Sequence, residues 1–395
     1  MDPSHFEEEA IAAMRSFFGR ASTSQRARNQ LMKYLEDDPS FSPTTSIIPT
    51  EEIEIRLEMI EEIRQAHETL YPEAESFHFT TLQFSTFLLM PMDRLRIFHL
   101  DPATAFSHLK PDAYLYFMVT GKTPGENQKN SDVTSQQSST KAPSNRSVHR
   151  SARERKKCLA RDKDRCIFTK ASHPEGCHIL PFAINATQKN IDFFTSTEPF
   201  SLALLGTVVK HQTELLITAA PGSSDKSWNM LSLHPSLHHW WGKCFFGIKC
   251  LGIMPHDDEY SKVQVQFYWM PHHTRKPNDL VMQPYLNVIQ ELLQSPVNEQ
   301  ASLAITTDMR RDSGRELETG QTFEILVEND DAQKMKTMLD VQWAMVRLAA
   351  MSGAAQAWEL DDDPDDPGEI GDVVDISTAE RIERWMQTST PSMPH

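Results

Sequence analysis

Apolar residues recur at helical spacing through the first 120 residues. The clearest stripe lies between residues 53 and 70 and predicts a helix with one buried face. Its members are Ile53, Leu57, Ile60, Ile63 and Leu70. Thr50, followed by two glutamates, is expected to cap this helix. Further helices are predicted at 6–20, at 24–38 before Pro39, and within the Phe- and Leu-rich segments 80–98 and 102–119.

In the second half of the chain, some segments repeat apolar residues at strand spacing and others at helical spacing. Alternating apolar and polar residues at 263–269 predict a strand, and TFEILVE at 322–328 predicts another. Residues 278–294 have a helical pattern, and 335–358 predict a long amphipathic helix. The segment 296–320 is polar and predicts a loop. Helices and strands in this order favour an α+β protein.

Two segments lack apolar periodicity. Residues 121–149 are rich in Ser, Thr, Gln, Asn, Gly and Pro, so they are expected to form a disordered linker. Residues 359–375 hold nine carboxylates and no base, and they open a tail, 359–395, that is also expected to be disordered. This tail is interpreted as a solubilising segment, with DNA mimicry as the alternative.

The formal net charge of −16 is unevenly distributed. Residues 141–170 contain eleven Lys or Arg against three acids. Such a segment can neutralise phosphates, or it can be a solvated helix face that keeps a linker soluble, and the sequence leaves both interpretations open. The candidate nucleic-acid-binding residues are Arg153, Arg155, Lys156, Lys157, Arg161 and Arg165.

The cysteines and the amino terminus indicate the compartment. There are five cysteines, an odd number, and they form no CxxC pair, which predicts free thiols in a reducing environment. The acidic start MDPSHFEEEA lacks the basic and apolar pattern of a secretory signal, and the apolar runs are too short to span a membrane. The protein is therefore expected in the nucleus or cytoplasm, without a membrane partner.

The candidate functional residues lie between residues 164 and 250. His178 follows a short apolar approach, and Asn229 opens an apolar run. Pro235 is expected to start a helix, which places His238 in its first turn, while His234 before the proline is expected to act as a cap. The intervening insertion, 182–227, contains a long apolar segment that can pack as helix or strand.

This ordered set resembles the HNH endonuclease family, in particular the fungal proteins that carry an HNH domain within a longer chain. The resemblance rests on Cys177-His178-Ile179, Asn229 and Pro235-x-x-His238, followed by WWGKCFFGIK, and extends over residues 150–358. It implies a ββα-metal core and metal-dependent hydrolysis of phosphodiester bonds, with DNA as the expected substrate.

The resemblance also implies roles for single residues. His178 would be the general base, Asn229 would orient it, and His238 would bind one divalent ion, Mg²⁺ with Mn²⁺ or Zn²⁺ as substitutes. Cys177 occupies the place of a second metal ligand; as a soft thiolate it would suit Zn²⁺, and as a buried thiol it would only pack. Since flanking CxxC pairs are absent, no structural zinc is expected.

The predicted organisation has five parts: an N-terminal helical region (1–120), the linker (121–149), the HNH nuclease domain (150–275), a strand and helix extension packed on it (276–358), and the acidic tail (359–395). The alternative to an endonuclease is a catalytically inactive HNH-fold module that binds nucleic acid or protein. Protein partners are not identified by the sequence.

Overall fold

The computed structural model describes residues 3–20, 23–43, 46–70, 76–103, 111–121, 148–282, 284–294 and 310–359. It divides into a compact unit, Met1–Ala357, and a second unit, Trp358–His395. The predicted linker, except for its ends, and the acidic tail beyond residue 359 lie outside the described residues. The predicted boundaries at residues 120, 150 and 275 all fall within the first unit and stay predictions.

The N-terminal region is helical, as the apolar periodicity predicts. The helices in described residues are α1 (Pro3–Gly19), α2 (Gln25–Glu36), α3 (Ile53–Leu70), α4 (Thr81–Leu89), α5 (Met92–Leu100) and α7 (Pro111–Thr120). The expected cap at Thr50 is wrong, because Glu52 adopts a positive φ of 58° and α3 begins only at Ile53. Ile60 and Ile63 are fully buried, whereas Leu70 at the helix end is half exposed.

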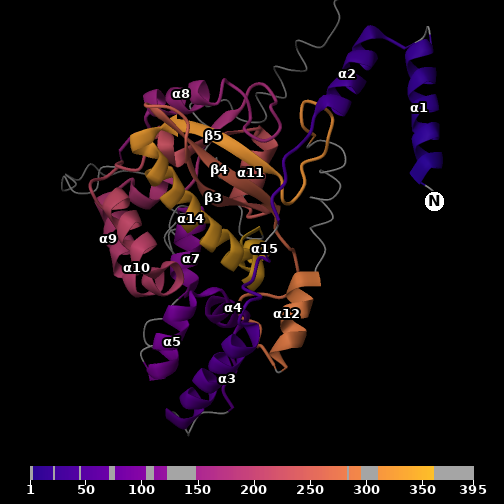
Figure 1. Ribbon diagram of the computed structural model, residues 1–395. Coiled ribbons are helices and arrows are strands. Elements are labelled where there is room, and N and C mark those ends of the chain that lie inside the picture. Colours follow the sequence, from indigo (N-terminus) through magenta and orange to yellow (C-terminus); the bar gives the residue numbers. More distant parts are fainter. Residues whose placement is uncertain are drawn as a thin grey trace, which may run out of the picture. The chain divides into compact units, whose positions relative to one another are not determined.

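The second half of the chain contains a three-stranded antiparallel sheet (Figure 1). Its strands are β3 (Phe246–Pro255), β4 (Tyr260–Trp269) and β5 (Thr322–Glu328), with β4 in the centre. Phe246 pairs with Trp269, and Tyr260 with Glu328. The strands predicted at 263–269 and 322–328 are thus confirmed, while β3 was not predicted.

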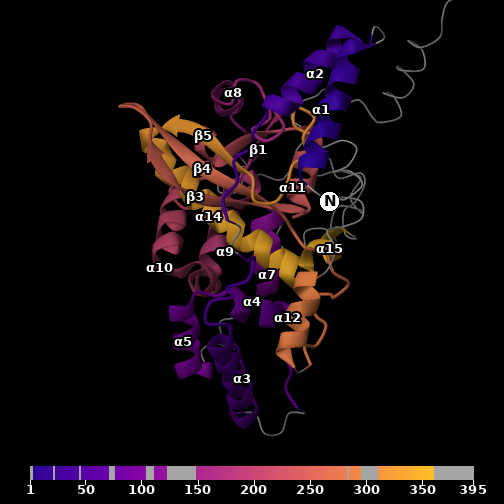
Figure 2. The ribbon, with the colours of Figure 1, turned by 45° about the vertical axis from the view of Figure 1, so that its right-hand side comes forward.

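One long helix, α14 (Asn329–Ser352), packs on this sheet (Figure 2). It contacts β3 and β4 and also α4, α7 and α10 (Glu198–Ile217), so it is buried on several faces rather than amphipathic. The predicted span 335–358 is corrected at both ends. The helix starts earlier and ends just before Gly353. Gly353 has a φ of 74° and separates α14 from the short helix α15 (Ala354–Glu359). A Cβ at Gly353 would lie 1.9 Å from the Arg275 carbonyl oxygen, so only glycine fits.

The helix predicted at 278–294 is shorter than expected. Helix α12 spans Tyr285–Gln294, after Pro284. Asn278 and Asp279 belong to a turn, and Leu280 forms an isolated bridge with Thr80. Val281 N–H donates to the Phe79 carbonyl at 2.8 Å and so ties this segment to the N-terminal helices.

The segment 150–242 supplies a second, two-stranded sheet. It contains α8 (Ala152–Arg161), β1 (Glu175–His178), α9 (Gln188–Ser196), α10, β2 (Met230–Leu233) and α11 (Pro235–Gly242). β1 and β2 are antiparallel, with Glu175 opposite Leu233 and His178 opposite Met230. Short 3-10 turns lie at Phe182–Asn185 and Ser227–Asn229. The insertion between the strands is therefore helical.

Cys166-Ile167-Phe168 is an apolar run that predicts a short strand, but these residues do not form one. The chain turns tightly between α8 and β1, with positive φ at Lys163, Asp164 and Lys170. Cys166 N–H donates to Ala171 O at 2.9 Å across this turn, and Ile167 N–H reaches Ser232 O at 2.9 Å. Only an isolated bridge between Arg165 and Ser172 has strand geometry here.

No helix in the described part of the chain combines the length and the apolar character that crossing a bilayer requires.

Candidate functional site

Strand β1 presents its side chains alternately to two faces. Glu175 and Cys177 share one face, and Gly176 and His178 share the other. Helix α8 packs closely at Gly176, where a Cβ would lie 2.9 Å from Arg155 Cγ. Helix α11 approaches the strand through Trp241, whose Nε1–H donates to the His178 carbonyl at 3.3 Å. Strand β1 is thereby packed between two helices.

His178 is paired with a carboxylate that the sequence analysis missed. Its Nε2 lies 3.0 Å from Asp225 Oδ1, and both side chains are almost fully buried, at 6% and 4% exposure. Asp225 Oδ2 accepts a second hydrogen bond, at 2.5 Å, from the N–H of Ser151 just before α8. The imidazole also lies near the Phe182 ring, with centroids 5.8 Å apart. The predicted base is therefore held in one orientation.

The environment keeps Asp225 ionised. Burial alone raises the pKa of its carboxyl group, but hydrogen bonds from His178 and Ser151, and the charges of His178 and Arg150, outweigh burial and lower the pKa below its ordinary value. An ionised carboxylate only accepts hydrogen bonds, so Nε2 of His178 carries a hydrogen. In the neutral imidazole the lone pair then resides on Nδ1.

Asn229 is buried just before β2 and fixes the turn that follows His178. Its Oδ1 accepts from Leu180 N–H at 3.0 Å, and its Nδ2 donates to Leu180 O and Ser224 O, both at 3.1 Å. Its own carbonyl accepts from Ile179 N–H at 2.8 Å. These hydrogen bonds hold the main chain just after His178 and just before Asp225. The role of Asn229 in orienting His178 stays a prediction that this geometry favours.

His238 is paired with a different carboxylate. Helix α11 begins at Pro235, and His234 caps it by accepting from Ser236 N–H at 3.3 Å, as expected. His238 Nδ1 lies 2.7 Å from Glu175 Oε2. This pair is partly open to solvent, since the side chains are 20% and 42% exposed. The predicted metal ligand therefore lies on the Glu175 face of β1, opposite the His178 face.

Cys177 points to the Glu175 face but is buried, with 1% exposure. Its Sγ donates to the Glu175 carbonyl at 3.4 Å. In the described part of the chain no three His, Cys, Asp or Glu side chains gather as a metal-binding group. The groups that fit a cation best here are the imidazole of His238 and the carboxylate of Glu175.

The candidate basic residues separate into two kinds. Arg153, Arg155, Lys156 and Lys157 are exposed on α8, and Arg165 is exposed in the following turn. Arg161 points inward instead: its guanidinium donates to Asp162, at 2.7 and 2.8 Å, and to the carbonyls of Ser227 and Met230, both at 2.9 Å. Arg161 therefore ties α8 to the segment before β2.

One family model matches the segment that carries this candidate site. Residues 166–249 match the family model of the HNH endonucleases, and the match includes Cys177, His178, Asn229 and His238. The chain thus carries an HNH endonuclease domain, which suggests nuclease activity in general, and HNH nucleases act on nucleic acids. Neither the curated proteins nor the solved structures contain a match to the chain.

Asp225 and Glu175, the two carboxylates of this site, were both missed. Glu175 could have been found, because it lies two residues before Cys177 and therefore shares its face of a strand. Asp225 gives no such local signal. It is 47 residues from His178, and two helices separate them in the chain.

Proposed function

We propose that this protein is a metal-dependent HNH-type endonuclease that hydrolyses phosphodiester bonds in DNA, built on a ββα-metal core of β1, β2 and α11. The observation that carries the proposal is the buried hydrogen bond between His178 and Asp225. A carboxylate that accepts from one imidazole nitrogen leaves the other nitrogen able to take a proton, which is the arrangement that general-base catalysis uses.

His178 is the base in this mechanism. Its Nδ1 removes a proton from the attacking water, and Asp225 stabilises the imidazolium that forms. Asn229 holds the turn after β1, so the imidazole keeps its direction during the proton transfer. Since Asp225 stays ionised, the imidazole is poised in the correct tautomer before substrate binds.

The open pair on the other face of β1 would hold the metal. A hard divalent ion such as Mg²⁺ needs few protein ligands and keeps several waters, and one imidazole with one carboxylate fits that demand. His238 and Glu175 would supply these ligands, with Mn²⁺ or Zn²⁺ as substitutes. When bound, the ion would supply positive charge for the leaving oxygen of the phosphodiester. Cys177 is not required, because its thiol is buried against the main chain.

The decisive experiment is nicking of supercoiled plasmid by the purified full chain with Mg²⁺, Mn²⁺, Zn²⁺ or EDTA. A metal should support nicking, EDTA should abolish it, and His178→Ala should reduce the rate by about 10²- to 10⁴-fold. His211→Ala is the matched control, because His211 is an exposed histidine of α10 outside the site. If wild type and His178→Ala are equally inactive with every metal yet bind DNA, the domain is a non-catalytic binding module.

A further inference from the structure

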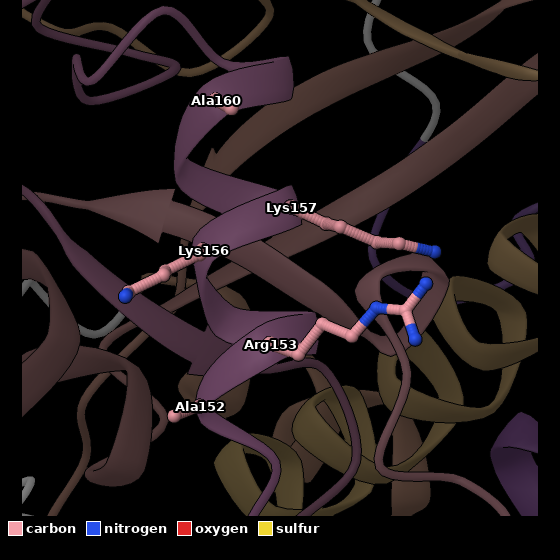
Figure 3. A pocket seen from close by; sticks show the side chains of 5 residues that line it. All are labelled: Ala152, Arg153, Lys156, Lys157 and Ala160. Carbon is pink, nitrogen blue, oxygen red and sulfur yellow. The ribbon is translucent and has the colours of Figure 1, made fainter.

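Helix α8 has one buried face and one exposed face that is basic. Glu154 and Cys158 are buried on its inward face. The outward face presents Arg153, Lys156 and Lys157, and it forms a hollow of about 540 Å³ with Ala152 and Ala160. In Figure 3 the side chains of Arg153 and Lys157 extend to one side of the helix and that of Lys156 to the other. Ala152 and Ala160 lie toward the two ends of the helix, with the three basic residues between them.

The positive charge of this face is not balanced within the helix. The sole acid of α8 is Glu154. Its side chain is only 11% exposed, and its Oε2 accepts from Ser227 N–H at 3.2 Å, although Oε1 also lies 3.7 Å from Lys157 Nζ. A chain with a net charge of −16 therefore concentrates cations on one exposed helical face. Such a concentration favours binding of an anionic partner.

The hollow is too open to enclose a small molecule. All its lining residues come from one helix, so it is open outward, whereas small-molecule sites enclose most of the ligand. From Arg153 to Lys157 the helix rises by about 6 Å. Phosphates follow one another at about 3.4 Å along the axis of each strand of DNA, so the three cations can neutralise two or three of them.

Hydrogen bonds connect this helix to the candidate site. Ser151, just before α8, donates to Asp225, which in turn binds His178. At its other end, Arg161 donates to Ser227 O and Met230 O. The helix is thus anchored at both ends to the segment that carries Asp225 and Asn229. A nucleic-acid strand lying along α8 would therefore contact a helix that is bonded directly to the segment carrying Asp225 and Asn229.

We infer that the outward face of α8 binds the sugar-phosphate backbone of nucleic acid through Arg153, Lys156 and Lys157, and positions it for the HNH site. The inference rests on the proposed function for the identity of the partner as nucleic acid. Arg161 is excluded from this contact surface because its guanidinium is committed to the protein interior. Contacts with phosphates make the binding independent of sequence and sensitive to salt.

The test measures the affinity of the full chain for a fluorescently labelled DNA duplex by anisotropy in the presence of EDTA. The measurement is repeated at salt concentrations from about 50 to about 200 mM. EDTA prevents cleavage, so a failure of the proposed nuclease activity does not affect the result. The triple variant Arg153→Ala, Lys156→Ala, Lys157→Ala should make the slope of log K against log salt less negative by about 1.8 to 2.7, at about 0.9 for each of two or three lost contacts. Two duplexes of unrelated sequence should give the same loss.

Matched variants separate local from overall charge. The control, Arg96→Ala, Lys189→Ala, Lys276→Ala, removes three cations from other elements and should leave the slope within about 0.5 of wild type. Arg153→Lys with Lys156→Arg and Lys157→Arg should also retain it, because the charge persists. A triple alanine variant that binds like the control overturns the inference, provided that its thermal unfolding is unchanged and that the acidic segment does not compete for this face.

A second arm of the test concerns the acidic segment 359–375, which holds nine carboxylates and no base. The variant with Asn at Asp361, Asp362, Asp363, Asp365 and Asp366 tests it. If the α8 substitutions weaken DNA binding in neither background, the inference is wrong. A loss seen only in the Asn variant means that the acidic segment competes with nucleic acid for this face, which supports the inference. An equal loss of slope in both backgrounds supports it.

Discussion

Two histidine–carboxylate pairs lie on opposite faces of the same four-residue strand, and they differ in exposure. The His178–Asp225 pair is buried, with side chains 6% and 4% exposed, and Asp225 has a second partner in Ser151. The Glu175–His238 pair is 42% and 20% exposed. The first pair is fixed in one geometry, whereas the second can exchange its hydrogen bond for water or a cation.

In the proposed mechanism the two faces have separate tasks that match this difference in exposure. A general base needs a defined tautomer and direction, which burial and two hydrogen bonds provide for His178. A ligand for a hard cation must be able to give up its hydrogen bond, which is easier at a partly solvated position. The proposed mechanism therefore divides proton transfer and cation binding between the two faces of β1.

Asp225→Ala should have the largest effect. It leaves the buried His178 imidazole and the Ser151 N–H without their acceptor, and breaking a buried pair in this way costs about 3 kcal/mol of unfolding free energy. Nicking should fall as well, since His178 loses its fixed tautomer. Urea unfolding followed by circular dichroism measures the stability change.

Glu175→Ala is the matched control for that change. Its pair is partly exposed, so the free energy of unfolding should change by only about 0.5 kcal/mol or less. If both substitutions cost the same stability, the contrast between a locked pair and an exchangeable pair is wrong.

His238→Ala should have the next largest effect, and on metal dependence rather than stability. Even the outer partners of metal ligands alter affinity about ten- to hundredfold, so losing a ligand should raise the Mg²⁺ concentration for half-maximal nicking by about tenfold or more. Binding of Mn²⁺ followed by electron paramagnetic resonance gives a readout independent of cleavage.

The neighbouring histidine supplies the control for this prediction. His239 lies about 100° further around α11, so His239→Ala should leave Mn²⁺ affinity unchanged. An equal loss in the two variants would show that neither histidine is a specific ligand.

The two pairs also differ in how far the sequence could predict them. The Pro235 start of α11, its His234 cap and the position of His238 follow from local rules, and all were predicted. Asp225 meets His178 only after the chain has passed through α9 and α10, and no local pattern records such a contact. The pairing that defines the base is therefore a tertiary feature.

The same distinction explains the errors in the fold. Period-2 alternation revealed β4 and β5, but β3 is interrupted by Gly247 and Gly252 and has a bulge near Cys250. Helix α14 was expected to have a solvent face, yet the sheet and three helices cover it. A sequence pattern shows that a residue is apolar or polar, but not how many elements pack around it.

A smaller effect is expected from the pH dependence of stability. The pKa of Asp225 is lowered on folding, so its ionised form contributes stability that is fully present above its unfolded pKa, about 4, and is lost as pH falls through the folded pKa. Asp225→Asn lacks this contribution. The difference in unfolding free energy between wild type and this variant should be constant above about pH 5 and shrink below about pH 4. A difference that grows in acid would contradict the ionised carboxylate.

The smallest effect is expected from Cys177→Ala. Cys177 lies on the Glu175 face, but its thiol is buried and donates to a main-chain carbonyl, so the proposed cation site does not need it. Nicking with Mg²⁺ should stay within about twofold of wild type, because a buried cysteine acts mainly as a small apolar group. Loss of Zn²⁺-supported nicking alone would assign the thiol to a softer ion. A loss with Mg²⁺ as large as that of His238→Ala would instead make Cys177 a ligand, and the cation would then lie against the strand rather than at its exposed edge.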